Sequence, residues 1–320
     1  MYAMQAGKDV YVEKPMANSI EECNIMTTAA NYYNRIVQVG QQQRNNPVFN
    51  EVMKLIRTGT IGSLRKINMW ANFKYGLGSV PAMDEPVPEG VDYNMWLGPA
   101  PKRPFNKNRF HGSWRHYWNY GGGMFSDWGV HLIDMGLWVT GKVQGPAQVL
   151  IFAANNSSFE RDRETFDTMN VMFPTKDYVI NYDMTAGVEK GPYDTMYGIS
   201  FIGDKATIKA NRHRFDIIPE WDGEKKQDMV EAKEFTEGRE SHREHVRNFL
   251  DCVKTRKTPA CPPEVGRAAA IHVHAANISA RVGEPVLIWD DKNNRFVNSE
   301  KANSYIIPDY RAPWTLPKIG

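Results

Sequence analysis

Residues Gly121–Gly136 read GGGMFSDWGVHLIDMG, in which three glycines precede apolar side chains at helical spacing. The spacing predicts a helix that begins near Met124 and ends before Gly141. Asp127 and His131 lie four positions apart, so an α-helix would place them on one face. A carboxylate that orients an imidazole forms a general base, and we therefore expect a functional site on this helix.

The same Asp–His pair also has less specific interpretations. Such pairs more often cap a helix or lie on its surface than catalyse a reaction, and two such side chains can also be ligands of a metal ion. Gly129 lies between them in the helix interior, where glycine costs about 1 kcal/mol relative to alanine. Close approach of a ligand to the backbone is one reason to retain it. A catalytic interpretation requires a second element elsewhere in the chain.

The composition limits the classes of partner. A chain of 320 residues is long enough for two domains, and a net charge of +2 gives no electrostatic reason to expect nucleic acid or a membrane as partner. Three cysteines without close spacing do not suggest a disulfide framework or a zinc site. No apolar run is long enough to span a membrane and no signal peptide is visible, so the default expectation is a cytoplasmic protein. His242 and His245 have no evident third metal ligand, and we expect two exposed histidines at a helix start.

The first part of the chain reads as strand, helix and strand. Asp9–Glu13 and Ile36–Gly40 are short apolar runs typical of strands, and Ser19 followed by Glu22 is a capping-box signature for the helix between them. This is a βαβ unit. A remnant of two strands cannot bury both faces of its sheet. We therefore expect an upstream half of this domain to be missing.

The rest of the chain predicts a different kind of sheet. Leu64–Tyr75 alternates apolar and polar side chains, and several short strand-like runs with brief connections follow between Ala147 and Ile218. Such runs favour an antiparallel sheet. Residues 76–118 lack periodicity and are rich in Pro and Gly, so they form either an ordered lid beside the Asp–His helix or an arm that contacts another subunit.

Two motifs resemble one known family. The segment AGKDVYVEKPMANSIEE is similar to the region around the Glu-Lys-Pro motif of the Gfo/Idh/MocA oxidoreductases. That family's second motif, glycines followed by Asp-x-x-x-His, matches Gly122–Gly123, Asp127 and His131. The resemblance implies an α/β and α+β protein with two parts. Residues 1–45 would be the C-terminal part of a Rossmann NAD(P)-binding domain, and residues 46–320 a substrate and oligomerisation domain with a large, mostly antiparallel open sheet. An open sheet face suggests a homodimer or homotetramer.

The resemblance also implies the roles of particular residues. Its cofactor is NAD or NADP, its catalytic residues would be Lys14, Asp127 and His131, and no metal is needed. His131 would accept the proton of a substrate hydroxyl, Asp127 would orient His131, and Lys14 would donate to the substrate oxygen. The residues expected to contact the nicotinamide are Glu13, Pro15 and Gln42.

Further candidates concern the substrate. The family usually carries two arginines after the second strand, of which Arg44 matches the second while Gln43 replaces the first. Asp134 matches a ligand of substrate hydroxyls. Arg115 and Tyr117, in the long loop, are candidate substrate contacts for which a purely structural role is equally open.

These features predict an NAD(P)-dependent dehydrogenase that acts on a small sugar, cyclitol or polyol. One alternative is a glycosidase of similar fold that uses bound NAD for transient oxidation. Another is a truncated or non-catalytic relative that no longer binds cofactor, because the sequence has no G-x-G-x-x-G phosphate loop.

Overall fold

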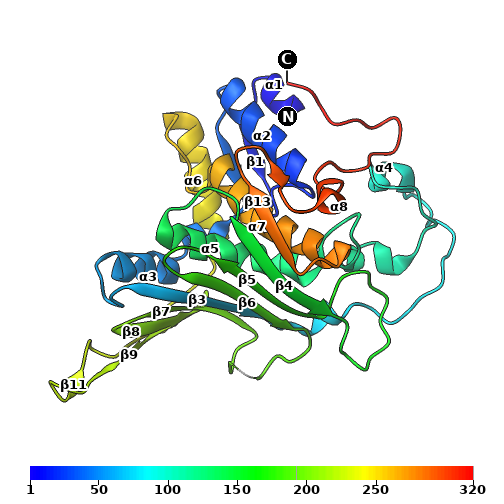
Figure 1. The fold of residues 1–320 in the computed structure, drawn as a ribbon. Helices are drawn as coiled ribbons and strands as arrows, with labels where there is room; N and C mark the ends of the chain where they lie inside the picture. The colour runs from blue at the N-terminus through cyan, green and yellow to red at the C-terminus, as the bar shows by residue number, and fades with distance from the viewer. Residues whose placement is uncertain (192, 320) are drawn as a thin grey trace.

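A pair of short parallel strands and a ten-stranded sheet organise the chain, in a computed structural model that describes residues 1–191 and 193–319 (Figure 1). The first residues form, in order, α1 (Tyr2–Gln5), β1 (Val10–Val12), α2 (Ile20–Tyr32), β2 (Val37–Val39) and the 3₁₀ turn η1 (Gln42–Asn45). Strands β1 and β2 pair in parallel, with Val10 opposite Val37. The backbone N–H of Glu22 donates to Ser19 Oγ at 3.2 Å, as the capping signature predicts.

The large sheet has the strand order β12-β9-β8-β7-β3-β6-β5-β4-β13-β14. Its strands are β3 (Leu64–Ala71), β4 (Gln148–Ala154), β5 (Thr168–Pro174), β6 (Val179–Thr185), β7 (Tyr197–Gly203), β8 (Ala206–Ala210), β9 (Phe215–Pro219), β12 (Lys233–Phe235), β13 (Val286–Asp290) and β14 (Arg295–Phe296). Every neighbouring pair is antiparallel except β3 with β6. A mostly antiparallel sheet is therefore confirmed. A separate small hairpin joins β10 (Trp221–Asp222) to β11 (Gln227–Asp228).

Helices cover one face of this sheet. Helices α3 (Pro47–Arg57), α5 (Val130–Thr140) and α7 (Pro263–Val282) contact its strands, and α5 and α7 lie along its middle (Figure 1). The others lie further out: α4 (Tyr93–Leu97) belongs to the long loop, α6 (His242–Thr255) packs on η1, and α8 (Glu300–Asn303) packs on α7 and β14. The alternation in β6 follows from this, since Ile180, Tyr182 and Met184 are buried against the helices. On the opposite face Phe152 is 60% exposed.

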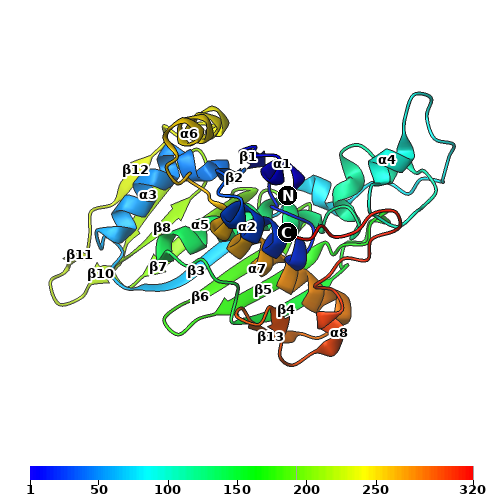
Figure 2. The same cartoon turned by 90° about the horizontal axis from the view of Figure 1, so that it is seen from above.

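Helix α7 connects the two sheets. It packs against α2 on one side and against β4 on the other, and in the view from above β1, β2 and α2 lie over it (Figure 2). The backbone N–H of Val39 in β2 also donates to the carbonyl of Cys261, just before α7, at 2.9 Å. The small parallel pair is thereby held against the helical layer of the large sheet.

The glycine-rich stretch forms the predicted helix with one irregular turn. Residues Phe125–Gly129 are a π-helical turn, η5, which continues into α5. A Cβ on Gly129 would lie 2.3 Å from Cδ2 of Phe125, so the packing of the Phe125 ring is sufficient to require glycine there. Gly123 has a φ of +73°, a backbone conformation that favours glycine, and it also lies against the Thr165 side chain.

The long loop between β3 and η5 is ordered and has a small core of its own. It contains the 3₁₀ turns η2 (Lys74–Leu77), η3 (Lys107–Arg109) and η4 (Ser113–His116), together with α4. Tyr93, Leu97 and Phe105 pack together within it. Whether it acts as a lid or as a subunit arm stays a prediction.

The described residues also test the expectations about cysteines, histidines, metal ligands and membrane spans. All three cysteines are unpaired and buried. The expectation of two exposed histidines is wrong for His245, which is fully buried and bonded to Asn45 Oδ1 and the Val39 carbonyl, because it faces η1 and β2. No cluster of three or more His, Cys, Asp or Glu side chains placed to bind a metal is found among these residues. None of their helices is both long and apolar enough to cross a bilayer.

Candidate functional site

Lys14 and Asp127 meet where the small parallel sheet faces the π-helical turn. Lys14 follows β1, and its Nζ donates to Asp127 Oδ1 and to the Asp127 backbone carbonyl, both at 2.6 Å. The two side chains are 17% and 14% exposed, so the pair is partly open to solvent. An ammonium group has three donors, of which Asp127 takes two. One N–H of Lys14 is left for a ligand.

Two further side chains from the long loop converge on the same carboxylate. Tyr75 donates its hydroxyl proton to Asp127 Oδ2 at 2.8 Å, and Nε of Arg115 lies 3.1 Å from the same oxygen. The guanidinium of Arg115 also lies 4.7 Å from the Trp114 ring centroid. We call Lys14, Tyr75, Arg115 and Asp127 the Asp127 cluster. The structure places Arg115 beside Lys14 and Asp127, and its role as a substrate contact stays a prediction. Tyr75 was not singled out by the sequence.

The electrostatics of the cluster follow from partial burial. Desolvation lowers the pKa of Lys14 from its ordinary value, and Asp127 opposes this by favouring the ammonium form. Burial would raise the pKa of Asp127, but the charge and hydrogen bond of Lys14, aided by Tyr75 and Arg115, hold that pKa below its ordinary value. The cluster is thus a carboxylate surrounded by two cations and a phenol.

His131 lies near the cluster but does not have the expected partner. Its side chain is 3% exposed, and among the described residues its buried Nδ1 has no hydrogen-bond partner. The expectation that Asp127 orients the ring is not met, because the Asp127 carboxylate is engaged by Lys14, Tyr75 and Arg115. Burial, together with the charges of Lys14 and Arg212, lowers the pKa of His131 well below its ordinary value. The imidazole is therefore neutral near pH 7.

Arg212 supplies a cation that the sequence did not indicate. It lies in the turn between β8 and β9, and its guanidinium stacks 4.7 Å from the Trp128 ring centroid. With the Gln43 amide oxygen turned toward it, that oxygen accepts from Nε of Arg212 at 3.1 Å. Glu240 Oε2 is 3.6 Å from Nη1 of Arg212, and the Glu240 side chain is 60% exposed. A guanidinium thus stands next to Gln43.

Arg44 and Asp134 form an enclosed ion pair instead of facing a ligand. Nε and Nη2 of Arg44 donate to Asp134 Oδ1 at 3.0 and 2.8 Å, and Nε also lies 2.9 Å from Oδ2. The side chains are 7% and 0% exposed. This geometry does not agree with the prediction that Asp134 binds substrate hydroxyls and that Arg44 is a second substrate contact. The two side chains hydrogen-bond to each other inside the protein.

Tyr117 is also turned away from the Asp127 cluster. It is 2% exposed, and its hydroxyl donates to the backbone carbonyl of Asp162 at 3.3 Å. Its backbone belongs to the same loop as Arg115, but its ring packs into the loop's interior. The structure therefore favours a structural role for Tyr117 over the expected substrate contact.

The carboxyl ends of β1 and β2 adjoin the cluster, and dinucleotides bind at such ends in α/β sheets. Glu13 is exposed there, while Pro15 and Gln42 are half-buried. Gln41 donates to the Val130 carbonyl at 3.4 Å, and its buried Oε1, like Nδ1 of His131, has no partner among the residues described. An edge of parallel strands with unmatched polar atoms fits the nicotinamide end of a dinucleotide.

A parallel strand pair held against a large, mostly antiparallel sheet, with a lysine–aspartate cluster between them, defines a Rossmann-like oxidoreductase of the α/β class. The chain belongs to the Gfo/Idh/MocA oxidoreductase family. The family model described as "Oxidoreductase family, C-terminal alpha/beta domain" matches residues 45–169 and 223–316. The model described as "Oxidoreductase family, NAD-binding Rossmann fold" matches residues 1–41, which confirms the expected class of cofactor.

The individual relatives either have low sequence identity to this chain or match only part of it. Inositol 2-dehydrogenase 3 of Saccharopolyspora erythraea is 37% identical over 62 residues, which are 19% of this chain and 18% of that protein. Among solved structures, the aldose-aldose oxidoreductase of Caulobacter crescentus has a TM-score of 0.62 at 19% identity, covering 89% of this chain and 73% of the other. An inositol dehydrogenase homologue of Azotobacter vinelandii has a TM-score of 0.62 at 15% identity, covering 90% and 73%. These structural likenesses show the fold.

Proposed function

We propose that this oxidoreductase transfers a hydride between a hydroxyl-bearing carbon of a sugar, cyclitol or polyol and NAD or NADP. The observation that carries the proposal is the Lys14 ammonium, held on Asp127 with one donor to spare, beside the neutral imidazole of His131. The structure of the Azotobacter vinelandii homologue was solved in complex with NADH and myo-inositol, which supports this class of substrate and cofactor.

Oxidation of an alcohol removes a hydride from carbon and a proton from oxygen. Glu13, Pro15 and Gln42 would hold the nicotinamide, which would supply the hydride acceptor. His131 takes the hydroxyl proton, which a neutral imidazole can do, and Lys14 donates its free N–H to the substrate oxygen as negative charge develops there. Asp127 positions Lys14 rather than His131, with Tyr75 donating to its second oxygen.

Substrate contacts fall to the two exposed or partly exposed guanidinium groups of the site. The Arg115 side chain is 36% exposed and the Arg212 side chain 13% exposed, and each stacks on a tryptophan that fixes its position. We propose that these two arginines, and not Arg44, Tyr117 or Asp134, contact substrate oxygens.

We also propose a division into a nucleotide-binding part, residues 1–45, and a substrate part, residues 46–320. The two family models meet close to this boundary, which supports it. The sheet face that carries exposed Phe152 is proposed as a contact between copies of the chain in a homodimer or homotetramer.

The test is a turnover assay with NAD⁺ or NADP⁺ and a panel of sugars, cyclitols and polyols, following reduced nicotinamide by absorbance. The expected result is reduction with at least one member of the panel, lowered about 10²-fold or more in His131→Ala. Fluorescence titration with NADH measures cofactor binding separately. Absence of both turnover and binding would contradict the proposal and favour a relative that no longer binds cofactor. Cleavage of an aryl glycoside without net NADH formation would favour the NAD-dependent glycosidase instead.

A further inference from the structure

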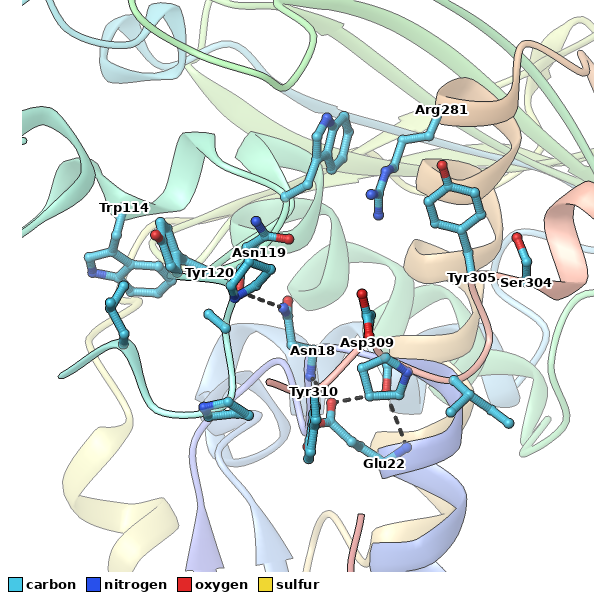
Figure 3. Close-up of a pocket in the computed structure, with 18 of the residues that line it drawn as sticks. Asn18, Glu22, Trp114, Asn119, Tyr120, Arg281, Ser304, Tyr305, Asp309 and Tyr310 are labelled. Atoms are coloured by element: carbon cyan, nitrogen blue, oxygen red, sulfur yellow. Dashed lines mark hydrogen bonds between the residues drawn. The ribbon is translucent and has the colours of Figure 1, made fainter. Parts of the chain in front are cut away.

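A cavity of 540 Å³ lies beside the site but contains none of its catalytic candidates (Figure 3). Its walls come from the start of α2, the long loop, the end of α7 and the segment after α8. Six aromatic side chains line it: Trp96, Trp114, Trp118, Tyr120, Tyr305 and Tyr310. We call it the aromatic cavity. Its volume is in the range of sites for small molecules.

A cation without a carboxylate partner stands at one end of the aromatic cavity. The Arg281 guanidinium lies 5.0 Å from the ring centroid of Trp118 and 4.4 Å from that of Tyr305, and Figure 3 shows it beside Tyr305. No salt bridge or hydrogen bond to Arg281 is found among residues 1–191 and 193–319. Two aromatic rings fix a guanidinium whose donors are free to bind an anion.

Acceptors and amides line the cavity between Arg281 and the start of α2. Asp309 is exposed, and in Figure 3 it lies between Arg281 and Glu22. Glu22 is engaged by the Ser19 hydroxyl at 3.0 Å and by the Tyr310 hydroxyl, so Asp309 is the freer acceptor. Asn18 Nδ2 reaches the Asn119 carbonyl at 3.4 Å, a long hydrogen bond that a ligand hydroxyl can replace.

This combination matches the chemistry of an acidic sugar. The C–H faces of a pyranose ring pack on indoles, its hydroxyls bond to carboxylates and amides, and a ring carboxylate pairs with a guanidinium. Glu22 and Asp309 disfavour a ligand that carries several negative charges, such as a polyphosphate. We propose that the aromatic cavity binds a hexopyranose unit bearing a single carboxylate, with that carboxylate on Arg281 and the ring on Trp114 and Trp118.

The proposal is independent of the redox function, because binding can be measured without cofactor. The probes are methyl β-D-glucuronide, methyl β-D-glucoside, acetate and AMP, titrated by calorimetry and by the fluorescence of the lining tryptophans. The glucuronide is expected to bind saturably, and the glucoside at least about tenfold more weakly since it lacks the carboxylate. Acetate, which lacks the ring, is expected not to bind at the same concentrations. No saturable binding of glucuronide, equal binding of glucoside, or tighter binding of AMP would overturn the proposal.

Variants separate the charge from the stacking. Arg281→Gln is expected to weaken the glucuronide to the level of the glucoside while leaving the glucoside unchanged, and Trp118→Ala to weaken both. The matched controls are Arg65→Gln and Trp221→Ala, exposed residues at the start of β3 and in the β10–β11 hairpin, which are expected to bind as the parent chain does. Unchanged glucuronide binding by Arg281→Gln contradicts the proposal even if Trp118→Ala fails to fold.

Discussion

Two cation–carboxylate pairs connect the first 45 residues to the same helical segment, and they differ in almost every other respect. Lys14 and Asp127 are 17% and 14% exposed, and Asp127 is shared with Tyr75 and Arg115. Arg44 and Asp134, seven residues further along the helix, are 7% and 0% exposed, and among the described residues their side chains hydrogen-bond to each other and to no other group. The pairs have similar chemistry in the sequence and opposite environments in the fold.

The difference teaches how to separate an ion pair that acts on a ligand from one that holds the fold together. A ligand cannot reach a bidentate pair that has almost no access to solvent, and removal of one partner leaves an uncompensated buried charge. A partly exposed pair with a spare donor can rearrange around a ligand at a smaller cost in free energy than an enclosed pair. Access to solvent, more than residue type, makes the Asp127 cluster the candidate site.

The largest expected effect is on stability at the enclosed pair. Asp134→Asn should lower the free energy of unfolding by about 3–5 kcal/mol, because the buried Arg44 charge loses its partner. Chemical denaturation measures this. The matched control is Asp127→Asn, whose partners stay partly solvated and whose loss should be much smaller. An equal loss in the two variants would remove the distinction between the pairs.

The next effect concerns turnover at the open pair. Lys14→Ala should lower kcat/KM by about 10²-fold or more, since the donor to the substrate oxygen is lost, with little change in melting temperature. Steady-state kinetics with the best substrate of the panel measures this. A loss under about tenfold would take Lys14 off the catalytic list.

A smaller effect is expected from the phenol that supports Asp127. Tyr75→Phe removes one hydrogen bond to a carboxylate that keeps Lys14 and Arg115, and Tyr75 is 44% exposed. We expect kcat/KM to fall by about three- to tenfold. A loss as large as that of Lys14→Ala would show that Tyr75 itself takes part in proton transfer.

A further effect is a dependence of stability on pH. Burial lowers the pKa of His131 well below its ordinary value and that of His272 to about 4. The unfolded chain therefore binds more protons than the folded one below about pH 6.5, and stability is lost as pH falls from there toward about 4. Melting temperatures across this range should decrease steadily on acidification. His272→Asn, far from the Asp127 cluster, should flatten that slope without changing turnover, and an unchanged slope would contradict the prediction.

Much of the fold was predictable from local patterns. The βαβ start, the capped helix α2 and the mostly antiparallel sheet follow from the alternation of apolar and polar residues, the helix-capping residues and the short connections between strands. All of these signals depend on residues that are near neighbours in the chain. Lys14 and Asp127 were predicted to belong to one site through the family's two motifs, and the structure places them in contact.

The roles within the site were less predictable. The i,i+4 spacing of Asp127 and His131 predicts a contact between them, but the Asp127 carboxylate is engaged by Lys14, Tyr75 and Arg115, which come from other segments. Arg212 reaches Gln43 from a sheet turn about 170 positions later, which no local pattern can signal. The sequence contains many lysines and arginines, and none of its patterns indicates which one lies beside Gln43.

By itself, the amino-acid sequence determined the strands and helices, their caps and the family, because these depend on the order and periodicity of neighbouring residues. Only the tertiary structure decided which ion pair is enclosed and which is partly exposed to solvent. It also decided that Asp127 is not the hydrogen-bond partner of His131, and that Arg281 faces an aromatic cavity. Burial and charge pairing arise from segments far apart in the chain, and the chemistry of a titratable side chain depends on that environment.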